Sequence, residues 1–284
     1  MTALESLLGG IIDYAGLYPP AALDMHTALR NYLSFGRSQH ASASGRFIVD
    51  INRLTELREV AGDSIRHLRL SVLASPDTDW NSLAGLLHDG FTIDTIEIKT
   101  DLPSQIAHIA RCIPSDLTAH FEVPFDSPVS ETLDAISAAG ARVKLRMGGL
   151  VADAFPPALT VANMLKALAD RRIPFKATAG LHHPIRSHHP FTYAPDSPSG
   201  TMHGFLNLAC AAALLYFGGD VSQAILLLDE QNPDAWHITP DTIAWRNVRW
   251  STDQLRSFRE KFFTSFGSCS FAEPMDDLEA LGWR

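Results

Sequence analysis

The chain has 284 residues, of which 46% are hydrophobic and 19% charged, and its formal net charge is −9. This composition is typical of a globular protein with a full core and excludes the disordered and collagen-like classes. The negative charge and the lack of a Lys/Arg cluster argue against a surface for nucleic acid or an anionic membrane. Three widely spaced cysteines, no basic leader sequence and no apolar run long enough to span a bilayer favour a cytoplasmic protein.

Apolar runs alternate with helix-like amphipathic patterns over the first two-thirds of the chain. Strands are predicted, in chain order, at residues 10–16, 46–50, 67–74, 93–100, 117–125, 142–148 and 174–181. Helices are predicted between them at residues 54–61, 80–88, 105–112, 129–139 and 158–171. An eighth strand is expected somewhere after residue 237.

This alternation predicts a parallel sheet with crossover helices. No strand is followed by a GxGxxG turn, and the strands are evenly spaced, so a closed α/β (β/α)8 TIM barrel formed by residues 1–284 as one domain is favoured over a doubly wound open sheet. After residue 181 the regularity is lost. Residues 182–204 predict a long loop over the active-site face, followed by an apolar helix at 205–217 that is buried or forms an oligomer interface. Residues 197–249 are expected to shape the pocket.

Polar residues in four consecutive strands share one parity, which is the parity that faces the interior of a barrel. They are Glu97, Lys99, His120, Glu122, Lys144, Arg146, Lys176 and Thr178, with Gly180 and His182 next in phase. A structural network of salt bridges would explain any one pair of these charges. Convergence of all of them at the strand ends instead favours an active site, because barrels place their chemistry at that face.

Two of these strands carry a family resemblance. The segment AAGARVKLRMGG, residues 138–149, and the segment PFKATAGLHH, residues 174–183, resemble the sixth- and seventh-strand motifs of class I aldolases related to deoxyribose-phosphate aldolase. The resemblance implies a lyase of the TIM-barrel superfamily in which Lys144 forms a Schiff base. It further implies that Lys176 lies beside Lys144 and lowers its pKa.

The resemblance covers residues 94–181 and includes the fourth strand. The segment TIDTIEIKT, residues 92–100, is similar to the acidic strand-four motif of that family, which implies that Glu97 relays protons. Two features depart from the pattern. Arg146 stands where the family has a small hydroxyl residue, and no clear phosphate-binding turn follows in the eighth strand, so a phosphorylated deoxy-sugar is not the expected substrate.

The residue chemistry is compatible with this resemblance. A lysine is nucleophilic only when neutral, and burial together with a second cation lowers its pKa. Glu97 or Glu122 would then move protons, and Arg146 would bind a substrate carboxylate. We therefore predict Lys144, Lys176 and Glu97 as catalytic, with either lysine able to be the nucleophile. The predicted substrate-binding residues are Arg146, Lys99, His120, Glu122, Thr178, Gly180 and His182.

Two other classes of function stay open. His182, His183, His188, His189 and His203 could, with His120 and Glu122, ligate a divalent metal in a hydrolase or isomerase, although the sequence has no HExxH motif. A barrel that binds a small ligand without converting it is the other alternative. Cys269 in FGSCSF is interpreted as an inert thiol in preference to a nucleophile. We predict a small-molecule substrate, no cofactor and no bound metal, and a homo-oligomer is compatible with the sequence.

Overall fold

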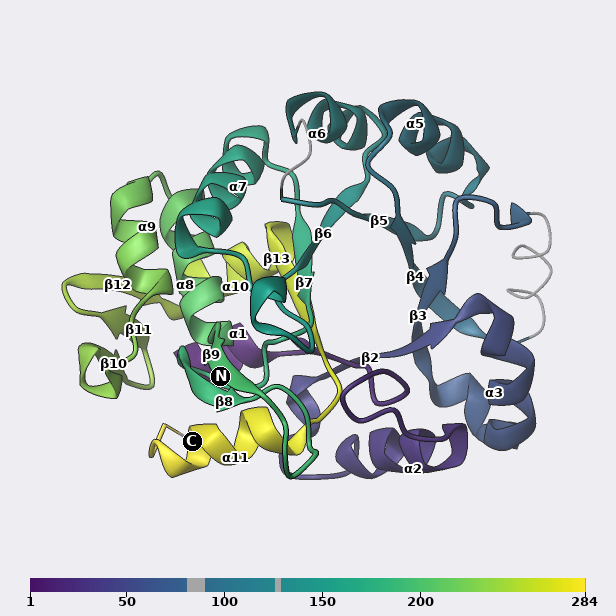
Figure 1. Cartoon of the computed structure of the whole chain (residues 1–284), viewed down its shortest axis with the longest axis horizontal. Helices are drawn as coiled ribbons and strands as arrows, with labels where there is room; N and C mark the ends of the chain where they lie inside the picture. The colour runs from purple at the N-terminus through teal and green to yellow at the C-terminus, as the bar shows by residue number, and fades with distance from the viewer. Residues whose placement is uncertain (81–89, 126–128, 284) are drawn as a thin grey trace.

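The computed structural model describes residues 1–80, 90–125 and 129–283. Eight parallel strands close into a barrel in the order β1-β13-β7-β6-β5-β4-β3-β2 (Figure 1). They are β1 Ile12–Tyr14, β2 Ser44–Asp50, β3 Arg69–Ala74, β4 Thr92–Lys99, β5 Thr118–Glu122, β6 Arg142–Arg146, β7 Phe175–Thr178 and β13 Phe263–Ser268. The predicted (β/α)8 barrel is confirmed.

Alternation along the strands divides the protein into two buried layers. Apolar residues of one parity pack between the barrel and the surrounding helices, where they form the core: Phe47, Val49, Leu70, Val72, Ile96, Ile98, Phe121, Val143, Leu145, Phe175 and Ala177. The other parity faces the barrel interior and is largely polar. Both faces of the barrel strands are therefore largely buried, as in other parallel sheets that helices cover.

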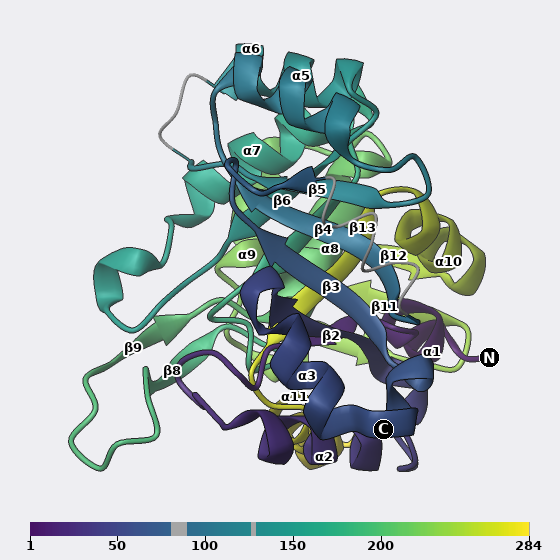
Figure 2. The same cartoon turned by 90° about the vertical axis from the view of Figure 1, so that its right-hand side faces the viewer.

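The helices that surround the barrel are α2 Met25–Phe35, α3 Leu54–Ala61, α5 Pro103–Cys112, α6 Val129–Ala138, α7 Ala158–Arg171, α8 Phe205–Tyr216 and α10 Thr252–Lys261 (Figures 1 and 2). The helices predicted at 54–61 and 158–171 have the expected bounds. Helix α5 begins two residues before its predicted start because Pro103 occupies its first turn, where the missing N–H costs nothing. The helix predicted at 80–88 lies almost wholly outside the described residues.

Helix α8 is the most apolar helix, and it is buried on all sides. Its residues from Phe205 to Leu215 are buried, and it packs between α7 and α9 Val221–Leu228. A helix that is hydrophobic around its whole circumference needs such a position. Of the two interpretations offered by the sequence, α8 is therefore a buried helix. None of the helices in the described part of the chain combines the length and apolarity needed to cross a membrane.

A long segment of the chain separates the eighth barrel strand, β13, from the seventh, β7. Before it the chain forms a small antiparallel sheet of β10 Trp236–Ile238, β11 Thr242–Trp245 and β12 Val248–Ser251, which packs outside the barrel near α1 Ala3–Leu8. Residues 197–249 were expected to shape the pocket. Within the described chain, Met202 is the one residue of this range that lines it.

The predicted loop at 182–204 is partly ordered as an antiparallel hairpin. Its strands are β8 Ser187–Pro190 and β9 Ser199–Met202. The segment that joins its strands contacts the last helix, α11 Ala272–Ala280, through the hydrogen bond from Tyr193 to Glu273, and Figure 1 shows the hairpin beside this helix. The hairpin residues Phe191 and Met202 line the cavity at the barrel mouth, so this segment borders the C-terminal face of the barrel.

Truncating a core residue of β13 tests whether this late strand closes the barrel. Phe266 is fully buried, and its ring stacks on Phe205 of α8 with the centroids 5.0 Å apart. We expect Phe266→Ala to reduce the free energy of unfolding by about 3–5 kcal/mol, as other buried Phe truncations do. Leu226→Ala, at a site 54% exposed on α9, should change it by less than about 0.5 kcal/mol. Urea unfolding curves that shift equally in the two variants would contradict this role of β13.

Candidate active site

A cavity of about 350 Å³ opens at the C-terminal ends of the barrel strands. Its wall includes the residues that directly follow three strands, namely Ala15 after β1, Ala179 after β7 and Cys269 after β13, and Gly149, three residues after the end of β6. The remaining lining residues are Tyr18, Pro19, Pro20, Ile48, Leu73, Glu97, Lys144, Arg146, Leu150, Thr178, Gly180, His182, Phe191, Met202 and Gly267. This is the face at which barrel enzymes place their active sites.

Lys144 is the lysine that reaches the cavity. Its Nζ lies 2.9 Å from Oε2 of Glu97 and 2.9 Å from Oε2 of Glu122, and its side chain is 9% exposed. Burial by itself would lower the pKa of Lys144, but the charges and hydrogen bonds of the two carboxylates outweigh it and raise the pKa above its ordinary value. The Lys144 ammonium is therefore charged at neutral pH.

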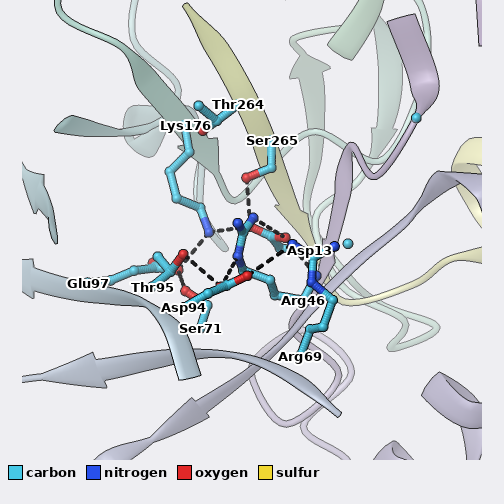
Figure 3. A network of polar contacts seen from close by, with 12 residues as sticks. Asp13, Arg46, Arg69, Ser71, Asp94, Thr95, Glu97, Lys176, Thr264 and Ser265 are labelled. Atoms are coloured by element: carbon cyan, nitrogen blue, oxygen red, sulfur yellow. Dashed lines mark hydrogen bonds and ion pairs between the residues drawn. The ribbon is translucent and has the colours of Figure 1, made fainter. Parts of the chain in front are cut away.

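Lys176 lies deeper, in the closed interior of the barrel. It is fully buried, and its Nζ donates to Oδ2 of Asp13 at 2.5 Å and to Oε1 of Glu97 at 2.6 Å (Figure 3). Ser265 also donates to Asp13, at 2.6 Å, and Ser71 donates to Glu97, at 2.5 Å. Both carboxylates and the ammonium thus have charged and hydrogen-bonded partners, which buried ions require.

Glu97 joins the two lysines through its two carboxylate oxygens. Oε1 accepts from Lys176 and Oε2 pairs with Lys144. Burial would raise the pKa of Glu97, but the charges of Lys144 and Lys176 and the hydrogen bonds of its neighbours hold the pKa well below its ordinary value. The carboxylate stays ionised, and it separates the two ammonium groups.

The expectation that the pKa of Lys144 lies below its ordinary value is therefore wrong for this structure. That prediction treated the lysines as an isolated pair of like charges. In the barrel, Asp13, Glu97 and Glu122 place three carboxylates around two ammonium groups, so attraction dominates for Lys144.

Arg146 occupies the open rim above Lys144. Its Nε donates to Oε1 of Glu122 at 3.1 Å, while its side chain is 54% exposed and lines the cavity. Burial would raise the pKa of Glu122, but Lys144 and Arg146 outweigh it and lower the pKa. A guanidinium with this much exposure keeps donors free for an incoming anion.

Only some of the other predicted binding residues line the cavity. Thr178, Gly180 and His182 line the cavity, as expected. Lys99, the last residue of β4, is exposed at the barrel rim and does not line the cavity, because its ammonium projects into water. His120 does not line it either: this side chain is buried below the cavity, and neither ring nitrogen has a hydrogen-bond partner within the described chain. Burial and the charge of Lys176 hold the pKa of His120 well below its ordinary value, so its ring is neutral.

Glycines at the ends of β6 and β7 bring these two strands' loops together. A Cβ on Gly148 would come within 2.9 Å of Cα of Gly180, and a Cβ on Gly180 would equally meet Gly148. Both would also collide with the ring of Phe155, at 2.5 and 2.6 Å. Gly180 also has a positive φ of 67°. The glycines that follow each lysine strand therefore allow the close packing that forms one side of the cavity.

Asp13 is the main residue of the buried network that the sequence-based prediction of the site did not include. Its backbone belongs to β1, a strand of three residues, and its side chain is fully buried. Gly45 leaves the space it needs, since a Cβ there would lie 2.5 Å from Oδ1 of Asp13. The available signal was the one used for the lysines: a single charged residue within an apolar strand, here IIDYAG.

The histidines of the loop and hairpin pair with carboxylates, hydroxyls and one another. Nδ1 of His182 lies 2.9 Å from Oε2 of Glu273, and Nδ1 of His183 lies 2.6 Å from Oδ2 of Asp277, both acids being on α11. His189 stacks on His183 with the ring centroids 3.4 Å apart. Within residues 1–80, 90–125 and 129–283, no three His, Cys, Asp or Glu side chains converge as metal ligands would. The metal-dependent alternative gains no geometric support.

Comparison with known proteins assigns no family to the chain. No family model matches it, and a search of curated proteins found no significant match.

The energetic role of the buried network can be tested at Lys176. We expect Lys176→Met to reduce the free energy of unfolding by about 3–5 kcal/mol, because the buried carboxyl groups of Asp13 and Glu97 lose the cation that they share. The matched control is Lys166→Met, which breaks an exposed ion pair with Asp170 and should cost no more than about 1 kcal/mol. Equal losses in the free energy of unfolding for the two variants, measured in urea, would show that the buried ion pairs stabilise the protein no more than the exposed pair does.

Proposed function

We propose that this protein is a lyase of the class I aldolase type, which acts on a small carbonyl compound through a Schiff base on Lys144. The observation that carries the proposal is the position of Lys144: its amine lies among ionised carboxylates at the cavity, whereas Lys176 is sealed below it. Amines that form Schiff bases need this combination of access to a carbonyl and nearby acid–base groups. We therefore assign Lys144, and not Lys176, as the nucleophile.

The first chemical step follows from the charge state of Lys144. Because its pKa is raised, the ammonium must give a proton to Glu97 or Glu122, each 2.9 Å away, before nitrogen can attack the carbonyl carbon. The protonated carboxyl returns that proton to the carbonyl oxygen, which gives the carbinolamine. A second proton passes from the nitrogen to this oxygen by way of the same carboxylate, and the oxygen leaves as water as the iminium forms. Breaking the bond between the α- and β-carbons sends its electron pair toward the iminium nitrogen and produces an enamine.

Lys176 has a supporting role in this scheme. It stays bonded to Asp13 and Glu97 throughout, so it fixes one oxygen of Glu97 and leaves the other directed at Lys144. Its positive charge also compensates Glu97 and makes loss of the Lys144 proton less unfavourable than it would be beside uncompensated carboxylates.

The cavity also indicates the kind of substrate. A volume of about 350 Å³ suits a small metabolite. Arg146 at the rim would bind a carboxylate of that molecule in a bidentate manner. The walls formed by Ile48, Leu73 and Met202 are apolar, which favours a substrate with an apolar portion over a fully hydroxylated sugar.

Reductive trapping tests this proposal. Incubation with a panel of small aldehydes and ketones and sodium borohydride should add the mass of the reduced carbonyl compound to the wild-type protein. Lys144→Ala should form no adduct. Lys176→Met should form it more slowly, with a pH profile displaced upward, because uncompensated Asp13 and Glu97 would raise the pKa of Lys144 further. An adduct that persists in Lys144→Ala and vanishes in Lys176→Met would reverse the assignment, and a wild-type protein that traps no carbonyl compound would contradict the proposal.

Glu97 can be tested separately from the nucleophile. Glu97→Gln keeps the shape of the side chain but removes the group that accepts a proton from Lys144, so we expect adduct formation to slow by about 10²-fold or more. Glu56→Gln, which alters an exposed pair with Arg53, provides a control that should trap at the wild-type rate. Unchanged trapping kinetics in a folded Glu97→Gln variant would remove Glu97 from the mechanism.

A further inference from the structure

A second group of reactive side chains borders the same cavity, away from the lysines. His182 follows β7 and lines the cavity, as does Cys269 after β13. Glu273 of α11 lies 2.9 Å from Nδ1 of His182, and Oη of Tyr193 donates to the same carboxylate oxygen at 3.1 Å. Three separate segments of the chain therefore meet around one imidazole.

The ring of His182 is oriented by this contact. Nδ1 is engaged by Glu273 and also lies 4.0 Å from Sγ of Cys269, so Nε2 is the ring nitrogen left for a molecule in the cavity. A carboxylate on one imidazole nitrogen fixes the ring and stabilises its protonated form, as in other acid–base pairs of histidine with a carboxylate.

The surroundings also set the charge of His182. Burial would lower its pKa, but its contacts with Cys269 and Glu273 outweigh burial and raise the pKa to about 9. Tyr193 faces the same carboxylate, and the ring of His183 lies 6.4 Å away, centroid to centroid. Burial would raise the pKa of Glu273, but its hydrogen bond and ion pair with His182 outweigh this and lower the pKa. At neutral pH the pair is an imidazolium and a carboxylate.

We propose that His182 is the acid–base residue that transfers the proton of the β-oxygen when the carbon–carbon bond forms or breaks, and that Glu273 is its positioning residue. This inference rests on the proposed Schiff-base function and deepens it. It divides the cavity into two parts: the Lys144 group converts the carbonyl into an iminium or enamine, and the His182 pair serves the second carbonyl fragment.

The step is balanced in both directions. In cleavage, Nε2 of neutral His182 takes the proton of the β-hydroxyl, the O–H electron pair forms the new C=O, and the electron pair of the broken C–C bond becomes the enamine double bond. In the direction of carbon–carbon bond formation, the enamine carbon attacks the aldehyde carbon, and the imidazolium gives its proton to the oxygen as the alkoxide develops. The imidazolium form at neutral pH is the form that addition requires.

The carboxylates of the lysine network do not serve this role equally well. Both oxygens of Glu97 already face lysines, and those of Glu122 face Lys144 and Arg146. His182 is a titratable group of the cavity wall that lies outside that network and retains a ring nitrogen for substrate.

The test separates the two halves of the reaction. A donor carbonyl compound that forms the borohydride adduct with wild-type protein is incubated in D2O, and exchange of its α-protons is followed by NMR as a measure of iminium and enamine formation. The same donor is then combined with a panel of aldehydes, and the β-hydroxy carbonyl product is measured. For His182→Gln we expect exchange within about threefold of wild type and addition slower by about 10²-fold or more.

Glu273→Gln provides a readout that a purely structural contact would not change. Loss of the carboxylate should lower the pKa of His182, so the decline in addition rate at alkaline pH should move to lower pH, while the pH dependence of exchange stays in place. The matched control is Asp277→Asn on the same helix, which removes the partner of His183 and should leave both pH profiles unchanged.

The outcomes distinguish this inference from the function on which it rests. A wild-type protein without any adduct overturns the Schiff-base proposal itself. If the adduct and exchange occur, the inference is overturned by any of three results: no addition to any aldehyde in the wild type, equal losses of exchange and addition in His182→Gln, or a pH profile for addition that is the same in Glu273→Gln and Asp277→Asn. Selective loss of addition with a displaced profile supports it.

Discussion

One carboxylate shared by two buried ammonium groups organises the interior of this barrel. Glu97 lies between Lys144 and Lys176 with one oxygen directed at each, and Asp13 and Glu122 pair with the two lysines at the two ends of the network. Buried charges are tolerated only when each has such partners, so removing any member leaves an uncompensated ion. The network holds both lysines in place, with Lys144 at the cavity and Lys176 buried below it, so that only Lys144 is accessible to a substrate.

The same arrangement gives the interior two levels with different properties. At the lower level, Lys176, Asp13, Ser71 and Ser265 are buried and fully bonded, and this level has the character of a structural core. At the upper level, Lys144 is bonded to the same network yet borders a cavity. The buried ion pairs thus hold the amine of Lys144 in position from the interior of the barrel. The loops that form the cavity wall contribute the groups that contact the substrate. Rigid support beneath adaptable loops is the general design of barrel active sites.

The sequence predicted the part of this site that depends on strand periodicity. Glu97, Glu122, Lys144 and Lys176 converge because residues two apart on a strand point the same way, and closure of the barrel brings those faces together. Periodicity ended where the strands end: Lys99 is exposed at the rim, and β7 stops at Thr178, so His182 reaches the cavity through a turn with positive φ at Ala179 and Gly180 and not through strand phase. A three-residue strand gave too little pattern to place Asp13. Glu273 could not be anticipated at all, because its contact with His182 joins residues 91 apart through the packing of α11 against the hairpin. The expected pKa of Lys144 was wrong for a similar reason. The sequence shows which charged residues are present, but it does not show that Glu97 lies between the two lysines or that two carboxylates surround Lys144.

The most direct test of the central claim is a crystal structure of the protein after reduction of the trapped carbonyl adduct. We expect electron density continuous with Nζ of Lys144 and extending into the cavity between Arg146 and His182, with Lys176 still bonded to Asp13 and Glu97. Density attached to Lys176, or an adduct on a surface lysine with an empty cavity, would contradict it.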